Sequence, residues 1–122
     1  MLMDNKKILL IDDERDFTVL VKKRIESWGY EFASASTGLS GIKALIKIKP
    51  DLVILDLVMS DMDGISVLKR IRKVNKKIPV IMLTSYEDFD MIKRAEDLNI
   101  AAFVFKMTLD VNLRSLVSGI LK

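Results

Sequence analysis

The chain has 122 residues, contains neither cysteine nor histidine, and carries 20 Lys and Arg against 17 Asp and Glu. Its length fits one domain over residues 1–122 with a sizeable core. The absent residues exclude disulfides, thiol nucleophiles, His-ligated zinc and a Ser-His-Asp triad, so any metal must be a hard cation with oxygen ligands. The formal net charge of +3 favours a solvated lysine-rich surface over one that binds an acidic partner. No segment is typical of a signal peptide or a bilayer span, so we expect a soluble, cytoplasmic protein without a membrane partner.

Strand and helix patterns alternate along the whole chain. Short apolar runs bounded by polar residues predict buried strands over 7–11, 31–35, 52–56, 80–83 and 102–105. Apolar residues at helical spacing predict helices over 16–28, 38–48, 65–74, 89–98 and 109–121. This alternation predicts an α/β fold of the flavodoxin-like kind. Its doubly wound five-stranded parallel sheet would have the order 2-1-3-4-5, with five flanking helices.

Several residues are expected to delimit or anchor these helices. Gly29 supplies a stop for the first helix, and Asn99 sits where a left-handed cap of the fourth is expected. Asp88 is a candidate N-cap of that fourth helix. The apolar stripe predicted to face the core from the helix over 38–48 consists of Leu39, Ile42, Leu45 and Ile46.

Four of the apolar runs end on polar residues that can do chemistry. In chain order, these polar residues are the pair Asp12 and Asp13, then Asp56, Thr84 and Lys106. In a parallel sheet all strand carboxyl ends share one edge, and ligands bind in the crevice there. The five side chains are therefore expected to converge on one small site, with the three carboxylates at the switch between the first and third strands.

Three adjacent carboxylates repel one another unless a cation or a proton lies among them. Mg²⁺, a hard cation with oxygen ligands, is the expected partner of Asp12, Asp13 and Asp56. The alternative is that Asp12 and Asp13 cap the first helix and Asp56 caps a turn. With a metal, the hydroxyl of Thr84 and the ammonium of Lys106 would complete a pocket for a phosphoryl group, and Asp56 would be the nucleophile. The alternative for Thr84 is that it is an ordinary β-branched strand residue, and the alternative for Lys106 is that its side chain is simply solvated.

These features resemble the receiver domain of bacterial two-component response regulators over essentially the whole chain. The resemblance rests on the acidic pair, the segment LDLVMSDMDG over 55–64, and the Thr and Lys that end the last two strands. It implies that Asp56 accepts a phosphoryl group from a histidine of a sensor kinase or phosphotransfer protein. It further implies that Asp12, Asp13, Asp56 and the backbone carbonyl of Val58 hold Mg²⁺. Such a domain is a phosphorylated signalling protein that catalyses only its own phosphoryl transfer and dephosphorylation.

The resemblance also implies a conformational switch. Phe103 aligns with the family's switch aromatic, which fills the space left when Thr84 moves toward the phosphoryl group. The face made by the helix over 89–98, the strand over 102–105 and the helix over 109–121 would then meet an output domain, a protein target or a second copy of the chain. Alternatively, Phe103 simply packs on the preceding helix. No segment is typical of a DNA-reading helix-turn-helix, so we expect no direct DNA binding by this chain.

The chain departs from the family pattern at several positions. Ser60 stands where a proline is usual, and Met107 follows Lys106 where a cis proline is usual. A cis bond before a non-proline residue costs about 2.5–4 kcal/mol, so the bond before Met107 is predicted to be trans, which could shift Lys106 away from Asp56. Phe103 lacks the hydroxyl of a tyrosine. Val58 and Tyr86 offer no carboxylate or amide to orient water, which predicts slow loss of phosphate.

Three other functions compete with this hypothesis. The first is a receiver-like interaction module that keeps the fold without switching, which only Ser60 and Met107 favour. The second is a flavin-binding protein of the flavodoxin kind, suggested by the segment SASTGLS over 34–40, although a phosphate loop is expected after the first strand. The third is a phosphatase with an aspartyl nucleophile, which would need a second Asp where Val58 stands.

Overall fold

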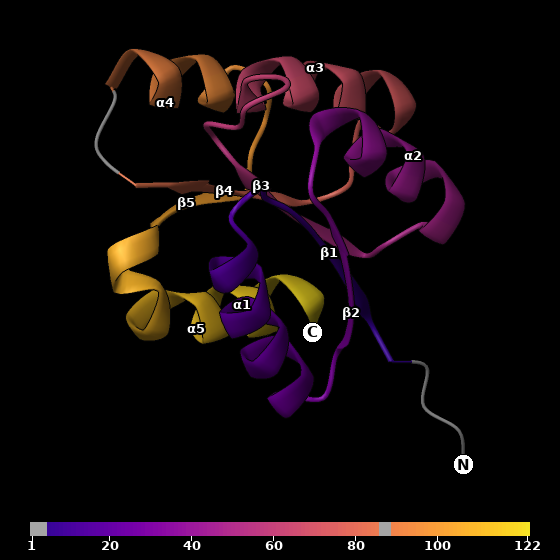
Figure 1. Ribbon diagram of the computed structural model, residues 1–122, viewed down its shortest axis with the longest axis vertical. Coiled ribbons are helices and arrows are strands. Elements are labelled where there is room, and N and C mark those ends of the chain that lie inside the picture. Colours follow the sequence, from indigo (N-terminus) through magenta and orange to yellow (C-terminus); the bar gives the residue numbers. More distant parts are fainter. Residues whose placement is uncertain (1–4, 86–88) are drawn as a thin grey trace.

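One parallel sheet separates two layers of helices (Figure 1). The computed structural model describes residues 5–85 and 89–122. The strands follow the order β2-β1-β3-β4-β5, with α2, α3 and α4 on one side and α1 and α5 on the other (Figure 1). The predicted fold class and strand order are confirmed. The elements are β1 (Lys7–Ile11), α1 (Arg15–Ser27), β2 (Glu31–Ala35), α2 (Gly38–Ile48), β3 (Leu52–Asp56), α3 (Gly64–Val74), β4 (Val80–Thr84), α4 (Phe89–Glu96), β5 (Ala102–Phe105), a 3₁₀ turn (Lys106–Thr108) and α5 (Leu109–Leu121).

The element boundaries differ little from those predicted. Gly29 and Asn99 have positive φ angles of 93° and 64°, as expected for residues that follow helix ends. Helix α4 ends at Glu96, two residues before the predicted end, and the 3₁₀ turn between β5 and α5 was not predicted. The predicted cap at Asp88 lies outside the described residues.

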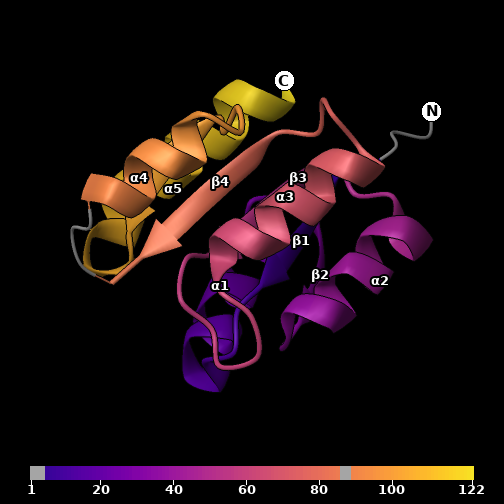
Figure 2. The ribbon, with the colours of Figure 1, turned by 90° about the horizontal axis from the view of Figure 1, so that it is seen from above.

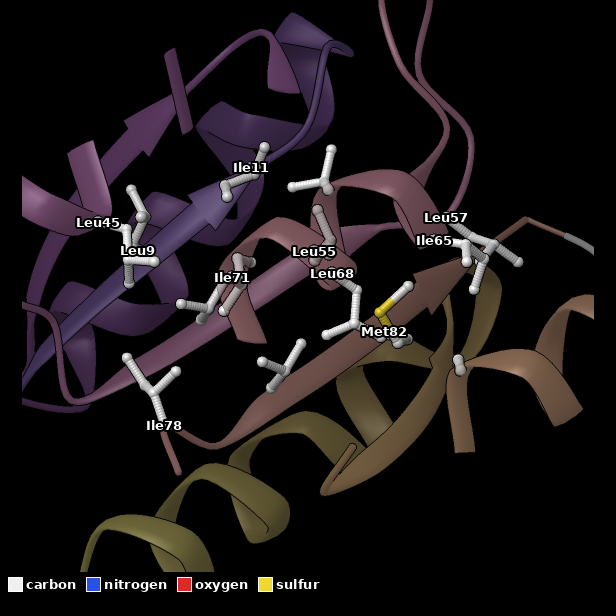
Figure 3. Close-up of a cluster of buried hydrophobic side chains, with 14 of the residues drawn as sticks. Leu9, Ile11, Leu45, Leu55, Leu57, Ile65, Leu68, Ile71, Ile78 and Met82 are labelled. Carbon is white, nitrogen blue, oxygen red and sulfur yellow. The ribbon is translucent and has the colours of Figure 1, made fainter. Parts of the chain in front are cut away.

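Alternating side chains of the strands build a separate core on each face of the sheet. One core includes Leu9, Ile11, Leu55, Met82 and the α3 residues Ile65, Leu68 and Ile71 (Figure 3). The other joins Ile8, Leu10, Leu52, Ile54 and Val104 to α1 and α5. Because β3 and β4 are buried throughout, the residues that end these strands are held by rigid structure.

The stripe that α2 buries is rotated from the predicted one. Its buried residues are Gly38, Gly41 and Leu45, whereas Leu39 and Ile46 are more than half exposed. Glycine allows α2 to lie close to the sheet on this side, because a Cβ atom at Gly41 would lie only 2.6 Å from the Ile11 side chain. The prediction that Leu39 and Ile46 belong to the core was wrong, because it counted only apolar side chains and did not consider that glycines could face the sheet.

Within the described part of the chain, no helix combines the length and the apolar character needed to cross a membrane.

Candidate functional site

Strand alternation places Asp12, Asp56 and Lys106 on the same side of the sheet. Two residues before each of them lie Leu10, Ile54 and Val104, which all belong to the core beneath α1 and α5. A step of two residues along a strand returns a side chain to the same face. The three polar residues therefore extend that face at the carboxyl ends of β1, β3 and β5, where the sheet stops and a ligand can enter.

Lys106 is the centre of the cluster. Its Nζ atom lies 2.9 Å from Asp12 Oδ2, 3.3 Å from Asp56 Oδ2 and 2.5 Å from Glu14 Oε1. The ammonium also lies 4.5 Å from the centroid of the Phe17 ring, a cation–π arrangement. The Lys106 side chain is only 9% exposed, so these contacts replace most of its hydration.

Lys106 remains in the site although Met107, and not a proline, follows it. The described chain contains no cis peptide bond, so the predicted trans bond before Met107 is confirmed. The 3₁₀ turn that begins at Lys106 leads the chain into α5, and Met107 is exposed to solvent. A trans bond is therefore compatible with an ammonium placed beside Asp56.

Asp13 is exposed and joins two loops of the site. Its Oδ2 atom accepts a hydrogen bond of 2.8 Å from the backbone N–H of Ser60. A proline at this position has no N–H to donate, so this contact depends on the departure from the family pattern. The same loop is fixed at Asp61, whose carboxylate accepts bonds of 2.9 Å from the N–H of Gly38 at the start of α2.

Gly64 allows the loop after Asp56 to close tightly. A Cβ atom there would lie 2.5 Å from the backbone oxygen of Asp56 and 2.7 Å from Leu57 Cα. The N–H of Gly64 donates a 2.7 Å hydrogen bond to the Leu57 carbonyl oxygen, and Asp63 caps α3 through the N–H of Ser66. The start of α3 is thus built against the backbone of the candidate nucleophile.

The three carboxylates fit a single hard cation. One oxygen from each of Asp12, Asp13 and Asp56 lies within 4.8 Å of the others. Oxygen ligands at ~2.1 Å around Mg²⁺ lie up to about 4.2 Å apart, a difference that small rotations of the carboxylates remove. Asp12 Oδ2 is buried, and its one contact with a charged group of the described chain is the ion pair with Lys106 Nζ at 2.9 Å. It retains capacity for a cation.

Burial controls the protonation of the cluster. It raises the pKa of Asp56 from 3.8 to about 6, the negative charge of Asp12 adds to this shift, and Lys106 opposes it. Burial also raises the pKa of Asp12, against the hydrogen bond from the N–H of Glu14. For Lys106, burial lowers the pKa, but the adjacent negative charges of Glu14 and Asp12 outweigh this effect, so the net pKa is raised. The carboxylates are therefore held ionised at a cost that a bound cation would relieve.

The remaining predicted residues lie at or near the same edge. Thr84 is buried at the end of β4 and pairs in register with Phe105. Phe103 is partly buried and packs against the core beneath α2, α3 and α4. The N–H of Val58 donates a 3.3 Å hydrogen bond to Asp56 Oδ1, and its side chain is 50% exposed. Tyr86 lies outside the described residues.

Two residues of the cluster were missed in the sequence. Glu14 was not considered, although it is the third of three consecutive acids, and Phe17 was not assigned to the site. The run of acids was a usable signal for Glu14. The stacking of Phe17 on Lys106 depends on two segments that are distant in sequence, so no local pattern indicates it.

A buried carboxylate beside an ammonium and two further carboxylates suits metal-assisted phosphoryl transfer. Comparison with known proteins identifies the family of the chain. The family model of the response regulator receiver domain matches residues 8–118. Sporulation initiation phosphotransferase F of Bacillus subtilis is 38% identical over 96 residues, which cover 79% of this chain and 77% of that protein.

Longer relatives and solved structures complete the comparison. The transcriptional regulatory protein PhoP of alkaline phosphatase synthesis from B. subtilis is 39% identical over 72% of this chain, but the match covers 37% of that protein. The transcriptional regulatory protein ZraR of Escherichia coli is 34% identical over 74% of this chain, and the match covers 20% of that protein. A CheY-like receiver domain structure from Methanospirillum hungatei is 26% identical, with a TM-score of 0.85, over 96% of this chain and 91% of that one. The chain belongs to the response regulator receiver domain family.

Proposed function

We propose that Asp56 is the phosphoacceptor of a two-component signalling system. A carboxylate oxygen of Asp56 attacks the phosphorus of a phosphohistidine on a sensor kinase or phosphotransfer protein. A new P–O bond forms, the P–N bond breaks, and the imidazole nitrogen keeps the electron pair and takes up a proton. Water later cleaves the aspartyl phosphate to inorganic phosphate and the free carboxylate.

One observation carries this proposal: the buried Asp56 carboxylate lies 3.3 Å from Lys106 Nζ, with Asp12 and Asp13 beside it. The nucleophile must be ionised, and with a pKa of about 6 the carboxylate prevails at neutral pH. The absence of histidine from the chain agrees with a donor histidine on the partner. The family membership supports the same assignment.

Asp12, Asp13, Asp56 and the Val58 carbonyl are the proposed Mg²⁺ ligands. A bound Mg²⁺ would supply positive charge that screens the phosphoryl oxygens from the carboxylates. Lys106 supplies a second positive charge to those oxygens, and Thr84 supplies a hydroxyl donor from the end of β4. Lys106 is held in place by Asp12, Glu14 and the Phe17 ring, so its ammonium needs little reorganisation.

Incubation with acetyl phosphate and Mg²⁺, followed by intact-mass spectrometry, tests the proposal. Wild-type protein is expected to gain one phosphoryl group, and Asp56→Ala to gain none. Asp97→Ala is the matched control, because Asp97 is an exposed aspartate beyond the end of α4 and has no contact with the cluster. Absence of uptake by wild-type protein, or equal uptake by Asp56→Ala, contradicts the assignment.

We also propose that phosphorylation changes the face made by α4, β5 and α5, through Thr84 and Phe103. Continued alternation from Met82 places Thr84 on the face that carries Phe103, so a movement of one alters the space of the other. The partner would be an output domain, a separate protein target or a second copy of the chain.

A Phe103→Trp reporter tests this coupling. Its fluorescence is expected to change on addition of Mg²⁺ and beryllium fluoride, a phosphoryl mimic. The change should persist with Thr84→Ser, which keeps the hydroxyl, and disappear with Thr84→Ala. An unchanged signal in all three proteins favours the alternative of a non-switching interaction module.

The aspartyl phosphate is proposed to be long-lived. Val58 is aliphatic and half exposed, so its side chain cannot orient a water molecule toward the phosphorus. Purified phosphoprotein should decay over minutes or longer, and Val58→Asn, which adds an amide, should decay faster. A half-life of seconds for the wild-type protein contradicts this proposal.

A further inference from the structure

The modest net charge conceals a strong separation of charge. Residues 38–50 and 64–85 contain nine of the 20 cationic side chains and none of the 17 acids. The rest of the chain therefore has 11 cations against 17 acids. The two segments include α2 and α3, which lie side by side in both views (Figures 1 and 2). The surface formed by α2 and α3 is thus basic, while the rest of the chain carries a net negative charge.

Nearby carboxylates do not neutralise this face. Asp51, Asp61 and Asp63, which border the two segments, all accept hydrogen bonds from backbone N–H groups, of Lys7, Gly38 and Ser66 respectively. Glu96 and Asp97 near the end of α4 are exposed, and among the described residues no carboxylate forms an ion pair with a cation of α2 or α3.

Arg72 is the one cation of this face with a structural role. Its guanidinium donates hydrogen bonds to four backbone carbonyl oxygens around the ends of α3 and α4, including those of Leu98 and Ile78. The other eight cations are exposed to solvent. Favourable placement near helix C-termini accounts for Lys47 and Lys73. It does not account for the remaining six or for the apolar surface between the two helices.

A groove of about 320 Å³ lies between the C-terminal ends of α2 and α3. Three of its lining residues, Leu45, Pro50 and Ile78, are almost completely buried, whereas Ile46 and Val74 are 55% and 49% exposed. Lys49 and Asn75 complete the lining. The groove lies at the sheet edge opposite Asp56, because helices that follow parallel strands end at the strands' amino-terminal edge.

We infer that this groove binds an acidic segment of a protein partner, with one aliphatic or aromatic side chain of the partner inserted between Ile46 and Val74. Carboxylates of the segment would pair with Lys49 of the lining and with exposed lysines close to the lining residues in sequence, such as Lys47 and Lys73. The exposed aliphatic side chains of Ile46 and Val74 favour a protein over a nucleic acid, because phosphodiester groups bring no apolar surface to bury there. The concave shape likewise disfavours a flat bilayer surface.

Fluorescence anisotropy with a labelled synthetic peptide tests the inference. The peptide is an amphipathic helix of about five turns, with Glu and Asp flanking a stripe of Leu and Phe. It should bind the wild-type chain saturably, and binding should weaken as salt is raised. Lys47→Glu with Lys73→Glu should weaken binding at least tenfold, as should Ile46→Ser with Val74→Ser. A peptide whose Leu and Phe are replaced by Ser should bind at least tenfold more weakly.

The matched control is Lys22→Glu with Lys23→Glu, which reverses two exposed cations of α1 on the other face of the sheet. This variant should bind the peptide as wild type does. All these positions are exposed, so circular dichroism should report an unchanged fold. The inference is overturned if the peptide does not bind, or if the control variant loses as much affinity as the groove variants.

Three further outcomes would also overturn it: tighter binding of a 20-base-pair DNA duplex, tighter binding of phosphatidylglycerol vesicles, or self-association of the chain that the groove variants abolish. The measurement needs neither Mg²⁺ nor phosphate, so its result is independent of the function proposed for Asp56.

Discussion

The two ends of the sheet use charge in opposite ways. At the carboxyl edge, Asp12, Asp56 and Lys106 are buried and packed against one another. At the opposite edge, the lysines around the groove of α2 and α3 are exposed and have no ion-pair partner among the described residues. Buried charges are strongly coupled and costly to disturb, whereas exposed charges contribute little to stability. The first end is therefore suited to chemistry and the second to association with a partner.

Replacement of Lys106 should produce the largest difference between the two ends. Lys106→Met keeps the length of the side chain but leaves Asp12 and Asp56 without their cation, so the free energy of unfolding at pH 7 should fall by about 3 kcal/mol. Lys73→Met at the exposed end of α3 should change it by less than about 0.5 kcal/mol. Urea unfolding measures both. Equal losses would contradict the contrast, and Mg²⁺ should restore part of the loss in Lys106→Met only.

A second comparison concerns backbone packing at the acidic edge. Gly64→Ala places a methyl group against the backbone of Asp56 and Leu57, which cannot move aside as a side chain can. We expect a loss of about 2–3 kcal/mol and slower phosphorylation. Gly119→Ala is the control, because nothing lies within 4 Å of its added methyl group and alanine is favoured in a helix, with a gain of up to about 1 kcal/mol. A neutral result for Gly64→Ala would contradict the close approach of α3.

The pKa of Asp56 predicts that its charge opposes folding. Because the pKa is about 6 in the folded chain and 3.8 as its ordinary value, the folded state binds the proton more tightly, and this group removes stability as the pH rises from 4 to above 6. Asp56→Asn should therefore be more stable than wild type at pH 7.5, by about 1–3 kcal/mol. The gain should vanish at pH 4.

The charge of Asp61 is expected to affect stability in the opposite direction to that of Asp56. Hydrogen bonds from the N–H of Gly38 and of Leu39 lower its pKa, so its charge favours folding above its ordinary pKa and that contribution is lost as the pH falls. Asp61→Asn should be less stable than wild type at neutral pH, and the difference should shrink in acid. If Asp56→Asn lowers stability at pH 7.5, as Asp61→Asn is expected to do, the conclusion that the charge of Asp56 opposes folding is wrong.

The smallest expected effect concerns Ser60. Ser60→Pro removes the N–H that binds Asp13, and thermal unfolding should report a loss of about 0.5–1 kcal/mol. Ser60→Ala keeps this N–H and should match wild type. A loss with Ser60→Ala as large as with Ser60→Pro would assign the effect to the hydroxyl and not to the backbone contact.

Much of the site followed from local sequence patterns. The apolar runs before Asp12, Asp56 and Lys106 predicted strands, and parallel strands bring their carboxyl ends to one edge. That logic needs only the order of elements, so it succeeded for residues up to 94 positions apart, from Asp12 to Lys106. It gave no account of Glu14, because a residue beyond the strand end is placed by the course of the loop.

The basic groove shows the limit of such patterns. The sequence contains the runs without acids, but a periodic count of apolar residues assigned Leu39 and Ile46 to the core. The structure buries Gly38 and Gly41 instead, because a helix without Cβ atoms on one side can approach the sheet more closely. This rotation exposes Ile46, which lines the groove, and Leu39 at the other end of α2.

The sequence by itself determined the order of strands and helices, the strand ends that carry Asp12, Asp56, Thr84 and Lys106, and the total charge of +3. These depend on local periodicity and composition, which short-range sterics and burial translate directly into elements. Only the tertiary structure decided that Lys106 lies among Asp12, Glu14 and Asp56 above Phe17, and that α2 and α3 share one basic face. Those contacts join segments that are distant in sequence, and packing of the two helix layers on the sheet brings them together.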